Sequence, residues 1–339
     1  MRKVGIIGAG SWGTALAMVA LRAGSSVKIF ARAGKTVEEI NNSHTNARYL
    51  PGVTLDPSLI ATRELKDIAE CDLIVLAVPA QAIRSAVKSI EPFITKPTLF
   101  VLASKGIELS SGKLMSEVIE EILPIGSCAV LSGPSFAKEV AGNLPTASTI
   151  AAEKSSEIDH VIDALGSRTF RLYGSKDMIG LQIAGALKNV LAIGSGFVTG
   201  KGFGENARAA LITRGLFEMT QLGLSLGAKA ETFMGLSGLG DLLLTTMGDQ
   251  SRNMTLGKAL GKGSSLSEIM ENQNQVTEGV YTADSLQKIA DKAGVEMPIC
   301  TSIRRVLNGE ISASDAVELL LSRPYGKEEV DFSQIKQSA

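Results

Sequence analysis

Residues 3–13 read KVGIIGAGSWG, a short apolar run followed by glycines in the spacing G-x-G-x-x-G. A helical pattern begins inside this motif, and a second strand pattern, Val27–Ala31, follows about 20 residues later. In such a strand–turn–helix, Gly8 permits the tight turn, Gly10 lets a pyrophosphate approach the backbone, and Gly13 lets the helix pack against the strand. The stretch therefore predicts a dinucleotide-binding unit, with a plain strand-to-helix turn as the alternative.

The first half of the chain, to about residue 175, alternates short apolar, β-branched runs with helical stretches. Strands that are apolar throughout, rather than at every second position, are typical of a parallel sheet covered on both faces. Further strands are expected at Leu73–Val78, Thr98–Ala103 and Ala129–Ser132, with Thr146–Ala152 and Thr169–Tyr173 at the far edge, and helices at Thr14–Ala23, Ala82–Ile90 and Lys113–Ile122. The alternation predicts an α/β fold with a doubly wound, Rossmann-type parallel sheet.

The second half shows helical periodicity and no strand pattern. Apolar residues recur at i, i+3 and i+4 over Met178–Phe197, Asn206–Leu226, Val280–Ala293, Ile299–Leu307 and Ser312–Leu321. We therefore expect an N-terminal dinucleotide-binding domain at 1–176, an all-helical substrate-binding domain at 177–326, and a loose tail at 327–339. The length of 339 residues agrees with two domains of roughly 150 residues each.

The composition argues against several kinds of partner. With 34 basic and 35 acidic residues the net charge is −1, which gives no electrostatic footprint for nucleic acid or an anionic membrane surface. No window of about 18 uninterrupted apolar residues indicates a membrane span. Two histidines and three scattered cysteines (Cys71, Cys128 and Cys300) offer no metal-ligand spacing, so we expect no metal, and reduced thiols in a cytoplasmic protein.

The end of the second strand bears on which dinucleotide is bound. An acidic residue there would accept a hydrogen bond from a ribose 2′-hydroxyl, but the sequence carries Arg32 and no acid until Glu38. An arginine at this place can pair with the 2′-phosphate of NADP(H). We therefore expect NADP(H), with NAD(H) also used; the alternative is that Arg32 is a solvated surface charge.

The helical half places a few polar groups in apolar surroundings. Lys188 lies within the almost wholly apolar stretch 184–192, where a desolvated amine can act as a general acid or base, although a surface lysine fits equally well. Asp241 could hydrogen-bond that ammonium. Ser251 precedes a helical pattern as an N-cap candidate, and Arg252 and Asn253 beside a helix start suit a phosphate, with simple capping as the alternative.

Further motifs follow one another along the chain to about residue 310: Gly8–Thr14, Asn46–Gly52, Ala103–Ile107, Leu131–Ala137, Ala186–Val190, Ala209–Gly215, Gly238–Asp241, Ser251–Asn253 and Glu278–Val280. In this order they closely resemble the bacterial NAD(P)-dependent glycerol-3-phosphate dehydrogenases. Thr199, Thr246 and Thr277 depart from the acid, cysteine and valine that are frequent in that family. None of the three is a catalytic position.

The resemblance implies a role for each matching residue. It places Gly8, Gly10, Ser11, Trp12, Gly13, Arg32, Lys105, Ala137, Arg252, Val276 and Glu278 at the cofactor. It places Lys105, Gly133, Ser135, Lys188, Asp241, Ser251, Arg252 and Asn253 at the substrate, with Lys188 as proton donor and acceptor assisted by Lys105 and Asp241. It also implies a homodimer whose product supplies glycerophospholipid synthesis.

The expected reaction is reduction of dihydroxyacetone phosphate to sn-glycerol 3-phosphate by a hydride from NAD(P)H, with Lys188 protonating the oxygen. Two alternatives stay open: a reductase of the same plan that acts on another small keto or hydroxy acid, and a non-catalytic NADP(H)-sensing protein. Arg252 and Asn253 favour a phosphorylated substrate over the first alternative. A sensor would leave Lys188, Lys105 and Asp241 without a purpose.

Overall fold

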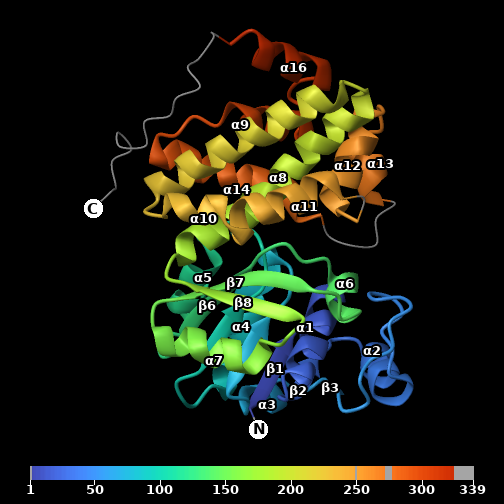
Figure 1. Ribbon diagram of the computed structural model, residues 1–339, viewed down its shortest axis with the longest axis vertical. Helices are drawn as coiled ribbons and strands as arrows, with labels where there is room; N and C mark the ends of the chain where they lie inside the picture. Colours follow the sequence, from blue (N-terminus) through green and yellow to red (C-terminus); the bar gives the residue numbers. More distant parts are fainter. Residues whose placement is uncertain (1, 249, 272–276, 324–339) are drawn as a thin grey trace. The chain divides into compact units, whose positions relative to one another are not determined.

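The computed structural model describes residues 2–248, 250–271 and 277–323, which form two compact units (Figure 1). The first unit contains the chain up to Lys105 together with Leu114–Met178, and the second contains Gly106–Lys113 and the chain from Ile179 on. The sequence pattern gave no sign that 106–113 belongs with the second unit. Ser285 Oγ donates to Ile107 O at 3.3 Å and Lys288 Nζ to Leu109 O at 3.0 Å, which fixes this segment there. The expected tail at 327–339 lies outside the described residues.

The first unit is built on one eight-stranded sheet in the order β3-β2-β1-β4-β5-β6-β7-β8. Its strands are β1 (Lys3–Ile7), β2 (Ser26–Phe30), β3 (Ile60–Thr62), β4 (Leu73–Leu76), β5 (Leu99–Leu102), β6 (Ser127–Ser132), β7 (Thr146–Ala152) and β8 (Phe170–Ser175). All neighbouring pairs are parallel except β6 and β7. The predicted doubly wound sheet is confirmed, and the chain order reverses between β1 and β4.

Two features of the sheet differ from the prediction. The β6–β7 connection contains only the five-residue helix α6 (Ala137–Ala141), so the chain returns antiparallel instead of crossing back along the sheet. Strand β3 is absent from the predicted set because three residues are too few for a periodic pattern. The side chain of Asn41 stabilises β3 from outside, donating to Ala61 O at 3.0 Å and accepting from Ala61 N at 2.8 Å.

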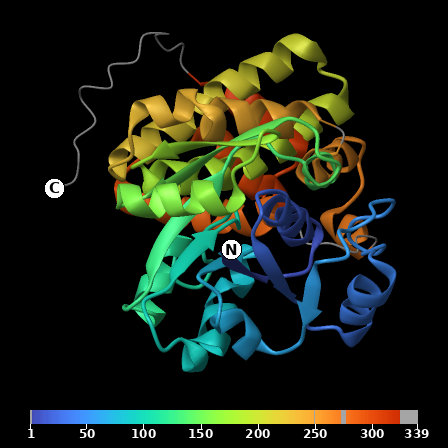
Figure 2. The same ribbon diagram turned by 60° about the horizontal axis from the view of Figure 1, so that its bottom comes forward.

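Helices cover both faces of the sheet, as the continuous apolar strands require. On one face Val4 and Ile6 pack in a core with Leu16 of α1 (Ser11–Arg22), and α1 contacts α6 and α7 (Ser155–Leu165). On the other face a Cβ on Gly5 would lie 2.7 Å from Ile68 of α3 (Leu65–Ala69). Helix α3 contacts α4 (Ile83–Ile90), which in turn contacts α5 (Met115–Ile122). Figure 2 shows α1, in dark blue, lying along the strands. The short helix α2 (Gly34–Glu38) follows β2.

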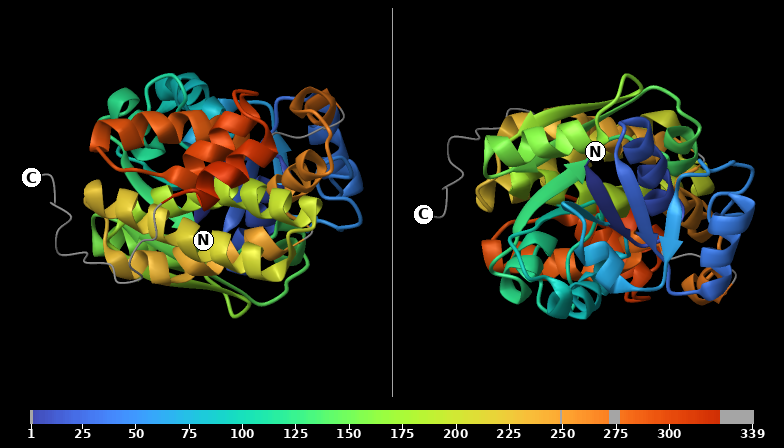
Figure 3. Two further views of the ribbon diagram at one scale, coloured as in Figure 1. Left: turned by 90° about the horizontal axis from the view of Figure 1, so that it is seen from above. Right: turned by 90° about the horizontal axis from the view of Figure 1, so that it is seen from below.

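The described part of the second unit is helical, as predicted. It contains α8 (Met178–Lys201), α9 (Gly204–Ser225), α10 (Ala230–Met234), α11 (Asp241–Met247), α12 (Arg252–Gly261), α13 (Leu266–Glu271), α14 (Glu278–Ala293), α15 (Pro298–Leu307) and α16 (Ala313–Leu321) (Figure 3, left). Helix α8 is long and apolar enough to cross a membrane by length and composition, but 94% of its apolar window is buried inside the structure. It is therefore the core helix of this unit.

Glycines let α12 cross α8 with their backbones in contact. A Cβ on Gly257 would lie 2.0 Å from Ile193 O, and one on Gly196 would lie 2.2 Å from Met254 O. Gly200 and Gly261 meet one turn further along, where a Cβ on Gly261 would lie 2.6 Å from Phe197 O. This close crossing brings the start of α12 beside the middle of α8, where Lys188 lies.

Candidate active site

The three glycines of the first turn have the backbone geometries that the sequence motif predicts. Gly8 has φ +117°, and a Cβ there would lie 2.7 Å from Ala77 O at the end of the neighbouring strand β4. A Cβ on Gly13 would lie 1.8 Å from Gly8 O, so only glycine lets α1 start this close to the strand. A Cβ on Gly10 would meet nothing within 4 Å. The backbone therefore borders open space at the position where a pyrophosphate would approach.

The start of α1 offers hydrogen-bond donors to a ligand. No described side chain caps this helix, so its first N–H groups have no side-chain acceptor. The indole Nε1 of Trp12 is buried and has no hydrogen-bond partner among the described residues. Buried donors without partners are costly, so this turn fits a polar ligand such as a dinucleotide.

The loop 46–52 holds the glycine turn in place, a structural role that the sequence did not predict. Asn46 is fully buried, and its Nδ2 donates to Ala9 O at 3.0 Å and to Thr14 Oγ1 at 2.9 Å. The hydroxyl of Ser11 donates to Tyr49 O. Ser11 is therefore tied to the 46–52 loop.

Three further predicted residues gather at the carboxyl ends of β5 and β6. Lys105 Nζ and Ser135 Oγ each donate to Gly133 O at 3.0 Å. Gly133 has φ +145°, and a Cβ there would lie 2.9 Å from Ser148 Cα, so the position requires glycine. Because β1, β4, β5 and β6 are parallel, these residues and the glycine turn lie at the same edge of the sheet. Ala137 begins α6, directly after this group.

In the second unit, Lys188 and Asp241 form a buried pair. Lys188 Nζ donates to Asp241 Oδ1 at 2.6 Å and to Thr245 Oγ1 at 3.0 Å. The Lys188 side chain is 9% exposed and that of Asp241 is 1% exposed. The pairing that the sequence suggested for these two residues is thus present, and Lys188 is not a surface lysine.

Local backbone structure explains how Asp241 reaches Lys188. A π-helical turn (Leu236–Gly240) precedes it, and a Cβ on Gly238 would lie 2.1 Å from Phe233 O, so the turn needs glycine. Asp241 begins α11, and Thr245 follows one helical turn later on the same face. The Thr245 hydroxyl donates to Asp241 O at 2.6 Å. Both oxygen groups therefore face the ammonium from a single helix.

Asn253 connects three helices through its buried side chain. Its Nδ2 donates to Asn189 Oδ1 on α8 at 3.0 Å, and its Oδ1 accepts from Gly279 N at the start of α14 at 3.1 Å. The preceding Ser251 is the N-cap of α12, as predicted, because its hydroxyl accepts from Met254 N at 3.2 Å. This arrangement fixes the start of α12 next to Asn189, the neighbour of Lys188.

Arg252 and Glu278 occupy the starts of two adjacent helices, α12 and α14. Desolvation lowers the pKa of the Arg252 guanidinium, and the negative charge of Glu278 partly opposes that shift. The two charges therefore act on each other across the helix starts. Val276, predicted with Glu278, lies outside the described residues.

Comparison with known proteins covers both units. Residues 3–158 match the N-terminal domain described as NAD-dependent glycerol-3-phosphate dehydrogenase N-terminus, and residues 177–318 match the corresponding C-terminus. The chain belongs to this family. A glycerol-3-phosphate dehydrogenase [NAD(P)+] of Parvibaculum lavamentivorans is 48% identical over 327 residues, which are 96% of this chain and 98% of the relative. One of Caulobacter vibrioides is 49% identical over 322 residues, 95% of this chain and 97% of the relative.

A solved structure agrees with the family assignment. The crystal structure of glycerol-3-phosphate dehydrogenase from Coxiella burnetii is 40% identical and superposes with a TM-score of 0.91, covering 95% of this chain and 99% of that one. The resemblance inferred from the motifs is therefore confirmed, as is the fold expected of a glycerol-3-phosphate dehydrogenase.

Two polar residues of the Lys188 group were not among the predicted site residues of this glycerol-3-phosphate dehydrogenase family member. Thr245 contacts the ammonium directly, and Asn189 holds Asn253. The spacing from Asp241 to Thr245 is a sequence signal for Thr245, since residues four apart share a helix face. Asn189 carries no such signal, because its partner lies 64 residues away.

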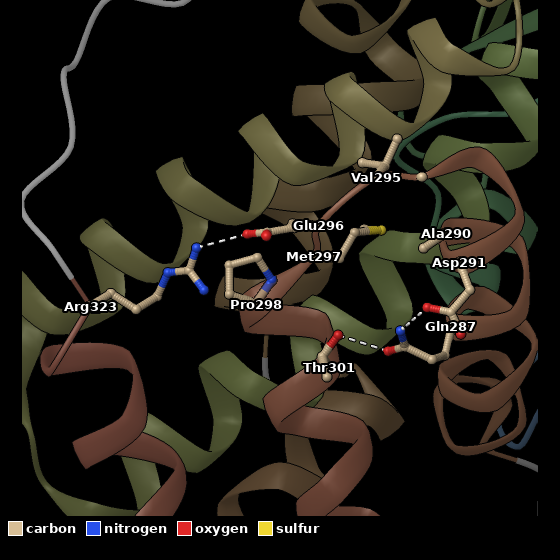
Figure 4. Close-up of a pocket in the computed structure, with 10 residues that line it drawn as sticks. Gln287, Ala290, Asp291, Val295, Glu296, Met297, Pro298, Thr301 and Arg323 are labelled. Atoms are coloured by element: carbon tan, nitrogen blue, oxygen red, sulfur yellow. Dashed lines mark hydrogen bonds and ion pairs between the residues drawn. The ribbon is translucent and has the colours of Figure 1, made fainter.

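A surface pocket of about 460 Å³ in the second unit contains none of the predicted site residues (Figure 4). It lies between α14 and α15, where Thr301 Oγ1 donates to Gln287 Oε1 at 2.7 Å and Arg323 pairs with Glu296 at 3.0 Å. Its polar groups are thus paired with one another. We assign it no part in the chemistry.

The three cysteines are free, and Cys71 and Cys300 are buried. Burial raises the pKa of the Cys71 thiol to about 11, which keeps it protonated near neutral pH. Among the described residues no three His, Cys, Asp or Glu side chains come together as a metal site.

Proposed function

We propose that the protein is an NAD(P)-dependent oxidoreductase that interconverts dihydroxyacetone phosphate and sn-glycerol 3-phosphate. The observation that carries the proposal is the buried Lys188, 2.6 Å from Asp241, in a chain that matches this dehydrogenase family over residues 3–158 and 177–318. A surface lysine would serve no chemistry, whereas a desolvated ammonium held by a carboxylate can deliver a proton to a defined place.

Lys188 is proposed to protonate the substrate oxygen as the carbonyl is reduced, and to remove that proton in the reverse direction. Asp241 and Thr245 hold the ammonium in one orientation through the bonds at 2.6 and 3.0 Å. The positive charge of Lys188 also stabilises the negative charge that develops on the oxygen in a water-poor environment. When bound, the reduced nicotinamide supplies the hydride.

The substrate phosphate is proposed to bind at the start of α12. Ser251 satisfies Met254 N, and the first N–H groups of the helix together with the Arg252 guanidinium provide donors for a phosphate. The side chain of Asn253 is occupied with Asn189 and Gly279, so we propose that Asn253 contributes through its backbone N–H and keeps the helix start in position. Lys105, Gly133 and Ser135 are the further substrate contacts proposed.

The dinucleotide is proposed to bind at the glycine turn of the first unit. Gly8, Gly10, Gly13 and the N-terminus of α1 hold the pyrophosphate, Ser11, Trp12 and Ala137 contact the cofactor, and Arg32 lies at the 2′ position of the adenosine ribose. Both NADP(H) and NAD(H) serve as cofactors in this proposal, with Val276 and Glu278 also near the dinucleotide. The division of roles is that the first unit binds the cofactor and the second carries the proton-transfer residue.

The cellular context is proposed on the same family basis. The protein acts in the cytoplasm as a homodimer, and its product enters glycerophospholipid synthesis. Analytical ultracentrifugation checks the dimer, and complementation of a strain that cannot make glycerol 3-phosphate checks the pathway.

Oxidation of NADPH and NADH, followed at 340 nm with dihydroxyacetone phosphate, tests the activity. Lys188→Ala should lower kcat at least about 10²-fold, the usual scale of general acid catalysis, while cofactor binding stays near normal. Binding can be followed through the fluorescence of Trp12, the single tryptophan of the chain. Lys201→Ala, at the exposed end of the same helix, is the matched control.

Three results would contradict the proposal. Near-normal turnover of a folded Lys188→Ala protein would remove Lys188 from the chemistry. Turnover of phosphate-free dihydroxyacetone or of a keto acid at a rate similar to that of the phosphorylated ketone would favour the alternative reductase. Cofactor binding without oxidation of NADPH or NADH would favour the sensor.

A further inference from the structure

Two arginines leave neighbouring strands at the same end of the sheet. Strands β2 and β3 are parallel with Phe30 opposite Thr62, and Ala31 N donates to Thr62 O at 3.1 Å. Arg32 follows the first of these strands and Arg63 the second. Both arginines therefore lie at the carboxyl ends of the strands, where parallel α/β sheets bind their ligands.

The Arg63 side chain turns toward the connection that carries Arg32. A Cβ on Gly34 would lie 3.9 Å from Arg63 Nη1 and 4.0 Å from its Cδ. Gly34 is only two residues after Arg32 and begins α2. Arg63 thus lies against the β2–α2 connection.

The cations of this region have no acidic partner in the part of the chain that the structure describes, although Glu38 and Glu64 stand near them in the sequence. Arg32, Lys35 and Arg63 are exposed, and none of their side chains makes a hydrogen bond or ion pair within the described residues. The acid of α3 is engaged elsewhere, because Asp67 accepts from Thr62 Oγ1 at 2.7 Å and lies 3.6 Å from Lys28 Nζ. Three cations without acidic partners form a surface that favours a multiply charged anion.

We propose that Arg63 forms, together with Arg32, a two-armed site for the 2′-phosphate of NADP(H), and thereby contributes to the choice between NADP(H) and NAD(H). This inference rests on the proposed function. A guanidinium is planar and can donate two hydrogen bonds to one phosphate, so two arginines from adjacent strands can hold a phosphate from two sides. NAD(H) lacks this phosphate and therefore cannot make the contacts with either arginine.

The direct test measures how the whole protein binds the adenosine part of the cofactor, without turnover. Isothermal titration calorimetry should measure adenosine 2′,5′-bisphosphate against adenosine 5′-phosphate, which differ only in the 2′-phosphate. The intact protein should prefer the bisphosphate, and Arg63→Ala should weaken its binding about tenfold or more, the effect of losing one charge-assisted contact. Binding of adenosine 5′-phosphate should change less than about twofold, and the KM for NADPH should rise more than that for NADH.

Matched variants separate this site from a general charge effect. Arg171→Ala removes an exposed arginine from β8, at the opposite edge of the same sheet, and should leave both affinities unchanged. Arg63→Lys keeps the charge but lacks the planar guanidinium. Its affinity for adenosine 2′,5′-bisphosphate should lie between those of the wild type and Arg63→Ala.

Three results would overturn the inference. Arg63→Ala could keep the preference for the bisphosphate, or it could weaken the binding of both nucleotides equally. Arg171→Ala could weaken the binding of the bisphosphate as much as Arg63→Ala does. Each of these leaves the proposed reductase activity standing. Absence of NADPH and NADH oxidation in the wild-type protein would instead refute the proposed function.

Discussion

Removal of the Asp241 carboxylate leaves the Lys188 ammonium buried without its ionic partner. The two groups are 2.6 Å apart, and their side chains are 1% and 9% exposed. Breaking a pair this deeply buried by removing one partner typically costs about 3–5 kcal/mol, because the remaining charge is uncompensated. We expect Asp241→Ala to lower the free energy of unfolding by about 3 kcal/mol, since Thr245 still accepts one bond from the ammonium.

A double-mutant cycle isolates the pair from other effects of the substitution. Urea unfolding followed by circular dichroism should compare the wild type, Asp241→Ala, Lys188→Met and the double variant. In the Lys188→Met background the Asp241 carboxylate is itself buried without its ionic partner, so Asp241→Ala should cost about 1 kcal/mol or less, and the coupling energy should be at least about 2 kcal/mol. Glu296→Ala is the control, since it breaks an ion pair of the same unit whose side chains are 84% and 49% exposed, and such pairs contribute about 0–1 kcal/mol.

The same pair is expected to matter for turnover. Asp241→Asn keeps the shape of the side chain but loses its charge, so the ammonium is less firmly oriented and kcat should fall while the KM for the phosphorylated ketone changes less. An equal cost of Asp241→Ala with and without Lys188, combined with unchanged kcat in Asp241→Asn, would refute the assignment of Asp241 as the residue that orients Lys188.

Two further predictions concern the helical unit. Burial raises the pKa of Glu218 from its usual 4.5 to about 7, against hydrogen bonds donated by Ile299 N and Cys300 N, so the folded state binds a proton that the unfolded state has released. The free energy of unfolding should therefore fall by up to about 3 kcal/mol as the pH rises from about 4.5 to about 7. Urea unfolding at pH 5 and 7.5 checks this, and Glu218→Gln should flatten the pH profile. A Glu218→Gln protein with an unchanged slope would contradict the prediction. Gly257→Ala should destabilise the protein by about 3 kcal/mol, because its Cβ would lie 2.0 Å from Ile193 O. Gly235→Ala is the control: its Cβ would lie 3.4 Å from the nearest atom, so the thermal midpoint should change little. Equal effects of the two substitutions would contradict the close crossing of α8 and α12.

Local patterns were sufficient to predict most of the fold. The apolar runs predicted β1 and β7 with their observed ends, and the helical periodicity predicted α8, α9, α14, α15 and α16 within a few residues. The glycine spacing predicted the tight turn, the open backbone and the close helix start separately, because each depends on one residue and its immediate neighbours. The sequence also marked Lys188, as a lone charge in an apolar helix is costly and therefore conspicuous.

Contacts between distant parts of the chain were decided only by the tertiary structure. The antiparallel β6–β7 pair, the transfer of 106–113 to the helical unit, and the approach of Arg63 to Gly34 have no periodic signal. The same holds for part of the site: the Lys188–Asp241 pair was expected from the sequence, whereas the bond between Asn189 and Asn253, which lie 64 residues apart, was not. Periodicity reports which face of a helix or strand is buried, whereas the pairing of two buried polar groups depends on how the helices cross. That crossing is set here by glycines of α8 and α12 whose role appears only when both backbones are in place.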